Sequence, residues 1–139
     1  MRLLLDTNVF VYMVNEPDRL TKDVCALLED PDNIKYLSTE SIRELIVAYR
    51  SKGLLSKVWR NEREMVDYIY NSWMWTVDAV DHSVLRQMAE LCINEAQDHN
   101  DPSDHIIIAQ AIAHRMTLIS SDGKFPFYRA QGLDLVENH

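Results

Sequence analysis

The chain has 139 residues, of which 47% are hydrophobic and 26% are charged, and it contains no long apolar run. This length and composition predict one compact domain over residues 1–139 with no membrane-spanning segment. The net charge of −8 argues against nucleic-acid binding through a broad basic surface, but it is compatible with an enzyme whose acids gather at one metal site.

The first half of the chain predicts strands that alternate with helices. Residues 3–5 form a short apolar strand that ends in Asp6, and this run is too short for a signal-peptide core, so we expect a cytoplasmic protein. Residues 21–28 predict a helix with Thr21 at its N-cap, and residues 34–37 predict a second strand. A helix capped by Ser38 or Thr39 and ended by Gly53 follows, and residues 56–72 predict a longer one.

The second half continues this alternation. Residues 76–80 predict a third strand and residues 83–95 a further helix. Asp101 and Pro102 are typical of the N-cap and first position of the next helix, whose residues 106–116 are apolar on nearly every side. Residues 117–120 predict a strand that leads into Asp122. Strands that alternate with helices predict an α/β fold with a parallel sheet covered by helices on both faces.

Four aspartates lie where such a sheet binds ligands. Asp6 and Asp122 follow the carboxyl ends of two predicted strands, and Asp101 and Asp104 open a helix. Taken singly, each is explained by a cap, a helix dipole or a turn. Like charges at one edge repel one another, and a hard cation such as Mg²⁺ or Mn²⁺ would offset that repulsion. Together the four acids therefore indicate a metal site.

Glu44 gives a weaker signal. The apolar residues Ile42, Leu45, Ile46 and Tyr49 form one face of the predicted helix, and Glu44 points away from its centre. Spacing alone predicts a solvated glutamate.

The ordered motifs resemble a known family. Residues 3–10, with Asp6, Thr7 and Asn8, are similar to the opening motif of PIN domains. Residues 38–54, which contain Glu44, are similar to the second motif. Residues 99–111 resemble the third motif of a VapC-like branch, and residues 118–122 with Phe125 resemble the closing motif. The motifs stand in family order over nearly the whole chain.

This resemblance implies a three-layer sandwich around a mostly parallel sheet and a metal-dependent endoribonuclease, the toxin of a toxin–antitoxin pair. It implies an acidic pocket for Mg²⁺ or Mn²⁺, cleavage of RNA by a metal-bound water, an antitoxin partner and a homodimer. Residues 59–75 are a candidate for the dimer face because they are rich in aromatic side chains. Thr7 and Asn8 match positions that support the first acid or contact the scissile phosphate. The implied metal-site acids are Asp6, Glu44, Asp104 and Asp122, with Asp101 as a further candidate.

Two positions depart from the branch. Ser103 stands where an aromatic residue is usual, and His105 stands where an arginine is usual, which removes a fixed positive charge near the pocket. His99 matches a histidine of the family, and we interpret it as a loop-packing residue.

Basic residues concentrate in one segment of this acidic chain. A solvated helix face and a substrate-facing strip both explain them, and on the second interpretation Arg50 and Lys57 contact RNA. The segment contains Arg43, Arg50, Lys52, Lys57, Arg60 and Arg63.

Three other functions fit parts of the pattern. A phosphatase or phosphotransferase with Asp6 as nucleophile would need a second acid two residues later, where the chain has Asn8. A receiver-type phosphoacceptor would need an early acid pair that is missing. A non-catalytic, degenerate PIN-like interaction module is the main alternative: the retained acids argue against it, and His105 argues for it.

Overall fold

The computed structural model describes residues 1–52 and 58–139. The strands are β1 (Arg2–Leu5), β2 (Ile34–Ser38), β3 (Thr76–Asp78), β4 (Thr117–Ser120) and β5 (Asp134–Glu137). The α-helices are α1 (Thr7–Asn15), α2 (Lys22–Glu29), α3 (Thr39–Lys52), α4 (Glu62–Asn71), α5 (His82–Glu90) and α6 (Pro102–Ala113). Short 3-10 helices are η1 (Pro17–Arg19), η2 (Glu95–Gln97) and η3 (Phe125–Gln131).

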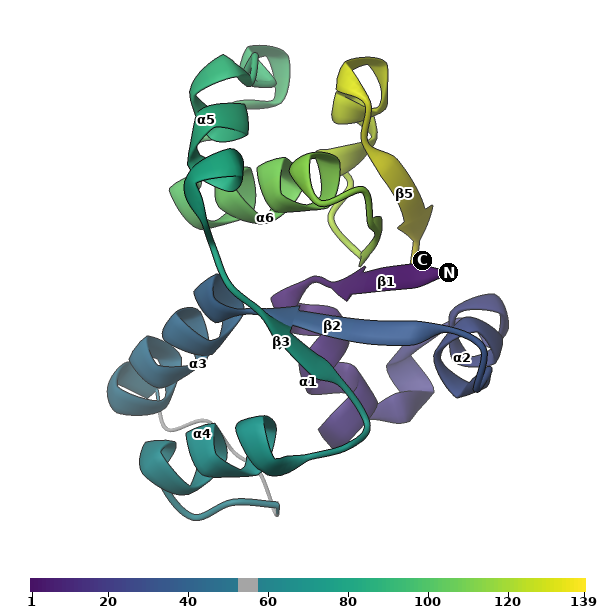
Figure 1. The fold of residues 1–139 in the computed structure, drawn as a ribbon, viewed down its shortest axis with the longest axis vertical. Coiled ribbons are helices and arrows are strands. Elements are labelled where there is room, and N and C mark those ends of the chain that lie inside the picture. The colour runs from purple at the N-terminus through teal and green to yellow at the C-terminus, as the bar shows by residue number, and fades with distance from the viewer. Residues whose placement is uncertain (53–57) are drawn as a thin grey trace.

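The strands form one parallel sheet in the order β3-β2-β1-β4-β5 (Figure 1). The chain builds outward from β1 to β3 on one side and then returns to place β4 on the other side of β1. This reversal between β1 and β4 is the topological switch point, and ligands of open α/β sheets bind beyond the carboxyl ends of the strands there. Leu5 pairs with Ile119, so the residues that follow these two strands emerge side by side.

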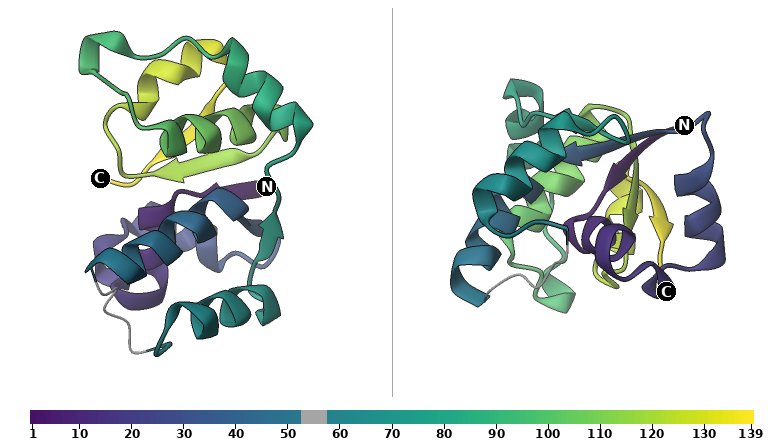
Figure 2. Two further views of the ribbon diagram at one scale, coloured as in Figure 1. Left: turned by 90° about the vertical axis from the view of Figure 1, so that its left-hand side faces the viewer. Right: turned by 90° about the horizontal axis from the view of Figure 1, so that it is seen from below.

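Helices cover both faces of the sheet, which confirms the predicted three-layer α/β fold (Figure 2). Leu3 and Leu5 point into a core with α1, α2, α3 and α4, whereas Leu4 points into a second core with α6 and η3. This alternation is the two-residue period of a strand with both faces buried. As its sequence predicts, α6 is largely buried, and α5 packs along it.

Two of the predicted helix starts are confirmed by their caps. The side chain of Thr21 accepts a hydrogen bond from the Val24 amide at the start of α2. Asp101 accepts one from the Ser103 amide at the start of α6, where Pro102 occupies the first helical turn. These contacts span at most three residues, which is why the sequence indicates them.

Several boundaries and elements differ from the prediction. The helix expected over 56–72 begins only with α4, at Glu62, because Asn61 caps it and accepts a hydrogen bond from the Glu64 amide. Gly53, expected to end the preceding helix, and residues 54–57 lie outside the described part of the chain. The helix expected over 83–95 ends at Glu90. The strand expected over 76–80 ends at Asp78, and the prediction lacked α1, β5 and the three 3-10 helices. Within the described residues, no helix is long and apolar enough to cross a membrane.

Candidate metal centre

Asp6 links the end of β1 to the start of α1. The pairing of β1 with β4 continues through its amide, which donates to the Ile119 carbonyl at 3.0 Å. Its Oδ1 accepts the Thr7 amide at 2.8 Å, and its Oδ2 accepts the Ser120 hydroxyl at 2.7 Å. Only 6% of Asp6 is exposed, so the strand-ending acid is a buried helix cap, held by donors from two segments.

The hydroxyl of Ser120 ties the ends of two neighbouring strands together. Its oxygen donates to Asp6 and accepts the Asp122 amide at 3.0 Å. Asp122 is half-buried, and its Oδ1 accepts the Lys124 amide at 2.9 Å. The sequence interpretation missed Ser120, although its place at the end of a strand beside β1 was a usable signal.

Glu44 does not point away from the site, as its position on the helical wheel had suggested. Thr7 Oγ1 lies 2.7 Å from Glu44 Oε1 and 2.9 Å from Ser41 Oγ. A hydroxyl has one proton and a carboxylate only accepts, so Thr7 donates to Glu44 and accepts from Ser41. The half-buried Glu44 is thereby held against the first residue of α1, next to Asp6.

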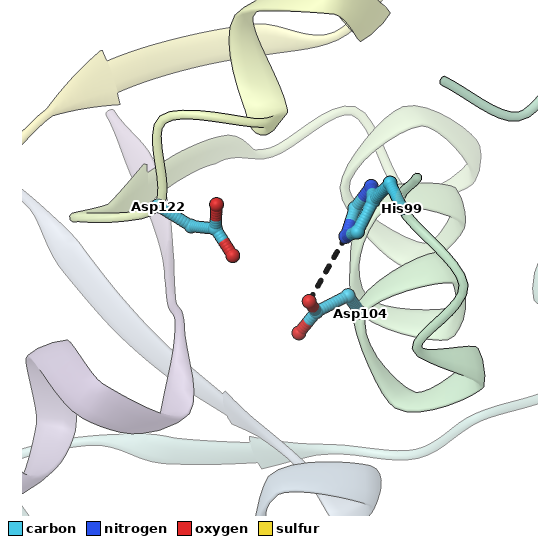
Figure 3. Close-up of side chains that lie close together, drawn as sticks. All are labelled: His99, Asp104 and Asp122. Carbon is cyan, nitrogen blue, oxygen red and sulfur yellow. Dashed lines mark hydrogen bonds and ion pairs between the residues drawn. The ribbon is translucent and has the colours of Figure 1, made fainter. Parts of the chain in front are cut away.

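Asp104 lies in the first turn of α6, and its carboxylate faces both His99 and Asp122 (Figure 3). Asp104 Oδ2 is 2.9 Å from His99 Nε2, and the other ring nitrogen, Nδ1, is 2.9 Å from the hydroxyl of Tyr128. Potential ligand atoms of His99, Asp104 and Asp122 all lie within 4.8 Å of one another, a spacing that suits a metal ion. His99 is therefore more than the loop-packing residue that we expected.

The electrostatics couple these acids. Burial, together with the negative charges of Asp104 and Glu44, raises the pKa of Asp6 to about 7, despite the hydrogen bond from Ser120. Burial likewise raises the pKa of Asp104 to about 7, and the charges of Asp101, Asp122 and Glu44 act in the same direction. Two aspartates with such pKa values cannot both be ionised cheaply at neutral pH unless a cation joins them.

The remaining candidates lie farther from this cluster. Asp101 is exposed and its side chain serves the cap of α6, although its charge acts on Asp104. Asn8 is exposed on α1. Arg50 lines a recess with Arg63 and other residues of α4, and Lys57 lies outside the described residues. The structure does not bring Arg50 to the acids.

Arg43, rather than Arg50, lies beside the acidic cluster. It lines a recess of about 270 Å³ between α3 and the start of α6, together with Glu44, Asp101 and Ser103. Its guanidinium pairs with both carboxylate oxygens of the largely buried Glu40, one turn earlier on the helix. This pairing engages the guanidinium itself, while the residue stays exposed at the rim.

His105 faces the protein interior. It is 8% exposed, and its Nε2 donates to the backbone carbonyl of His99 at 2.7 Å. A carbonyl only accepts, so this nitrogen carries a proton that is already engaged. The imidazole supports the loop of His99 and does not take the place of an arginine that reaches the pocket.

Comparison with known proteins adds a family and a fold. The family model described as PIN domain matches residues 3–132, and no curated protein matches the chain. The chain is similar to one in the structure of VapBC2 from Rickettsia felis bound to a DNA fragment from their promoter, with 21% identity, 100% coverage of both chains and a TM-score of 0.71.

The chain is similar to two further solved structures. VapBC-1 from nontypeable Haemophilus influenzae is 20% identical, with 99% of this chain and 98% of that chain covered and a TM-score of 0.69. VapBC-5 from Mycobacterium tuberculosis, a member of the VapBC family of toxin–antitoxin systems, is 19% identical, with 98% of each chain covered and a TM-score of 0.62. At these identities the likeness establishes a shared fold.

Proposed function

The chain belongs to the PIN domain family, and from this premise we propose that it is a metal-dependent endoribonuclease, the toxin of a toxin–antitoxin pair. One observation carries the proposal: buried and half-buried acids from four distant segments gather at the switch point of the sheet. Burial raises the pKa values of Asp6 and Asp104, and the charges of the neighbouring acids act in the same direction. The four acids are Asp6, Glu44, Asp104 and Asp122.

The donor set fits a hard divalent cation. Carboxylate oxygens are the ligands that Mg²⁺ and Mn²⁺ take in proteins. Among residues 1–52 and 58–139, no lysine or arginine forms an ion pair with Asp6, Asp104 or Asp122. The negative charge of the cluster is therefore not neutralised by a direct cationic partner from the described chain, and a bound cation would supply that neutralisation.

In this proposal the side chains have separate roles. Asp6 and Asp104 hold the ion, with Asp122 and Glu44 completing the acidic pocket. Ser120 fixes the carboxylate of Asp6, and Thr7 fixes that of Glu44. A divalent ion held by these residues would supply activation of a water and stabilisation of the leaving oxygen in phosphodiester cleavage.

RNA approaches an acidic site, so positive charge beside it matters. Lys124 lowers the pKa of Asp104 through its charge, and Arg43 lies at the rim next to Glu44. We assign these two residues to the phosphates that flank the scissile bond. Contacts to RNA from Asn8, Arg50 and Lys57 remain predictions.

The proposal also includes an antitoxin partner and a second copy of the chain. VapBC-5, one of the matched structures, is a member of a family of toxin–antitoxin systems, which supports an antitoxin partner for this chain. We also retain the cytoplasmic location and the homodimer expected from the sequence. Trp59 and Trp75 are buried in the core, whereas Trp73 is 93% exposed, so Trp73 is the tryptophan of the candidate face that a partner subunit can reach.

Cleavage of single-stranded RNA tests the function directly. We expect cleavage in Mg²⁺ or Mn²⁺, little in Ca²⁺, which prefers more ligands at longer distances, and none in EDTA. Asp6→Asn keeps a helix-capping side chain but removes a charge, and it should abolish cleavage. Asp32→Asn, an exposed acid in the turn before β2, is the matched control and should cut like the wild type.

Two results would contradict the proposal. Equal cleavage in EDTA would remove the metal from the mechanism. A chain that binds RNA but does not cut it with any divalent ion would instead be a non-catalytic PIN module.

A further inference from the structure

We propose that His99 and Tyr128 form a positioning pair for Asp104, in which His99 donates from Nε2 to the carboxylate and is not itself a metal ligand. The inference rests on the proposed function, because it gives Asp104 a place in the metal centre. His99 Nε2 lies close enough to Asp104 and Asp122 to join a metal site with them.

The hydroxyl of Tyr128 decides where the proton of His99 lies. The backbone amide of Asn94, which can only donate, points at Tyr128 Oη from 3.1 Å. The other polar contact that the structure gives Tyr128 Oη is His99 Nδ1, at 2.9 Å. The phenol has one proton, and of these two neighbours only the imidazole nitrogen can accept it. Nδ1 of His99 is therefore an acceptor.

The proton of the His99 ring therefore lies on the other nitrogen, Nε2. A neutral imidazole with an acceptor at Nδ1 carries its proton on Nε2, and Nε2 is 2.9 Å from Asp104 Oδ2. An N–H group has no lone pair for a metal ion. His99 therefore orients the carboxylate of Asp104, and within this group of three only Asp104 and Asp122 can offer the ion a ligand oxygen.

The surroundings of His99 hold the ring in this orientation. It is 1% exposed and contacts the rings of Phe125 and Tyr128, with centroids 5.5 Å away in each case. His105 packs against it edge to face at 5.0 Å and donates to its backbone carbonyl. Partners of metal ligands that are fixed in this way contribute about 10- to 100-fold to metal affinity or activity.

The ¹⁵N NMR spectrum of the imidazoles tests the tautomer in the full chain without metal. We expect His99 as the Nε2–H form, and we expect that form to persist when diamagnetic Mg²⁺ is added to saturation. Tyr128→Phe should abolish the preference for it. His105 provides an internal reference, since it donates from Nε2 to a carbonyl and touches neither Tyr128 Oη nor Asp104 through a hydrogen bond. Tyr36→Phe, in β2, is the matched control.

Either of two spectra would overturn the proposal. One is a His99 ring protonated at Nδ1 in the wild type. The other is loss of the Nε2 proton on Mg²⁺ binding, which would make His99 a ligand. Neither spectrum depends on whether the chain cuts RNA, so this test is independent of catalysis.

Mn²⁺ affinity, measured by calorimetry, tests the positioning role. His99→Phe keeps an aromatic ring without a donor and should weaken Mn²⁺ binding by about 10- to 100-fold. His99→Gln retains an N–H donor and should recover part of that loss. His82→Gln, at the exposed start of α5, should bind like the wild type. Circular dichroism melts establish that each variant is folded.

The outcomes separate this inference from the proposed function. A wild-type chain that binds no Mn²⁺ would contradict the proposed metal centre. Wild-type affinity in both His99→Phe and Tyr128→Phe would contradict only the positioning pair. If His99→Phe does not fold, His99→Gln and Tyr128→Phe give the same comparison.

Discussion

The hydroxyl oxygen of Thr7 lies 2.7 Å from Oε1 of Glu44 and joins the first residue of α1 to α3 across 37 residues of sequence. The contact brings Glu44 to the amino terminus of a helix that Asp6 caps. The partial positive charge of a helix start stabilises nearby carboxylates, and α6 also begins at this site. Two helix starts therefore offset part of the repulsion between the gathered acids.

Thr7→Val should release the side chain of Glu44 from its position beside Asp6. Valine keeps the volume of threonine but cannot donate, so Glu44 loses the hydrogen bond that orients it. We expect Mn²⁺ affinity and RNA cleavage to fall by about 10-fold or more, while the free energy of unfolding of the metal-free chain changes by about 1 kcal/mol. Thr76→Val, on the exposed side of β3, is the control. Unchanged Mn²⁺ affinity in Thr7→Val would remove Glu44 from the metal centre.

Asp104→Asn separates a metal ligand from a structural acid. Asparagine still accepts from His99, but it removes one charge from a repelling cluster. We expect the metal-free chain to be as stable as the wild type or slightly more stable, cleavage to be abolished, and the Mn²⁺-induced rise in melting temperature to shrink. Thermal melts with and without Mn²⁺, beside a cleavage assay, measure all three. Loss of several kcal/mol of metal-free stability would instead indicate a structural role.

The pH dependence of stability should run opposite to that of most proteins with ion-paired acids. Asp6 and Asp104 have pKa values of about 7 in the folded chain, well above those of unfolded aspartates. Between about pH 4 and pH 7 the folded chain therefore holds protons that the unfolded chain has lost. The free energy of unfolding should fall as pH rises through this window and then level off.

Melts of the metal-free chain at closely spaced pH values measure this slope. The double variant Asp6→Asn, Asp104→Asn should largely lose it, because it lacks both titrating groups. The stabilisation by Mn²⁺ should increase over the same window, since the ion competes with protons for the carboxylates. A metal-free wild type whose stability rises steadily from pH 4 to pH 7 would contradict the raised pKa values.

Arg50→Glu and Lys57→Glu test the basic segment on uncut RNA bound in Ca²⁺. If both residues contact phosphates, each change should weaken binding and reduce the slope of log affinity against log salt by about 1. Mn²⁺ affinity should stay unchanged. Arg86→Glu, an exposed arginine on α5 at the other face of the sheet, is the charge-matched control. An unchanged dissociation constant and salt slope would mean that the segment is only a solvated face.

Local signals in the sequence predict many of the strand ends and helix starts of this protein. Asp6 and Asp122 follow apolar strands, and Thr21 and Asp101 cap helices through amides two or three residues away. Because each of these features depends on neighbours within a turn of chain, the residue pattern is enough to indicate it. The same locality explains the missed start of α1, since Asp6 was interpreted as a strand end and not also as a cap.

The arrangement of the acids was decided by tertiary structure. Helical periodicity assigns Glu44 to a face of α3, but its environment is set by Thr7, which reaches it only because β1 and β2 pair side by side. His99 looks like an ordinary loop histidine until Tyr128, 29 residues later, sets its partner at Nδ1. Hydrogen bonds and interactions between charges act over a few ångströms of space. The pattern along the chain therefore predicts which acids are available. Only the packing of the sheet and its helices determines which of these acids lie close enough to interact.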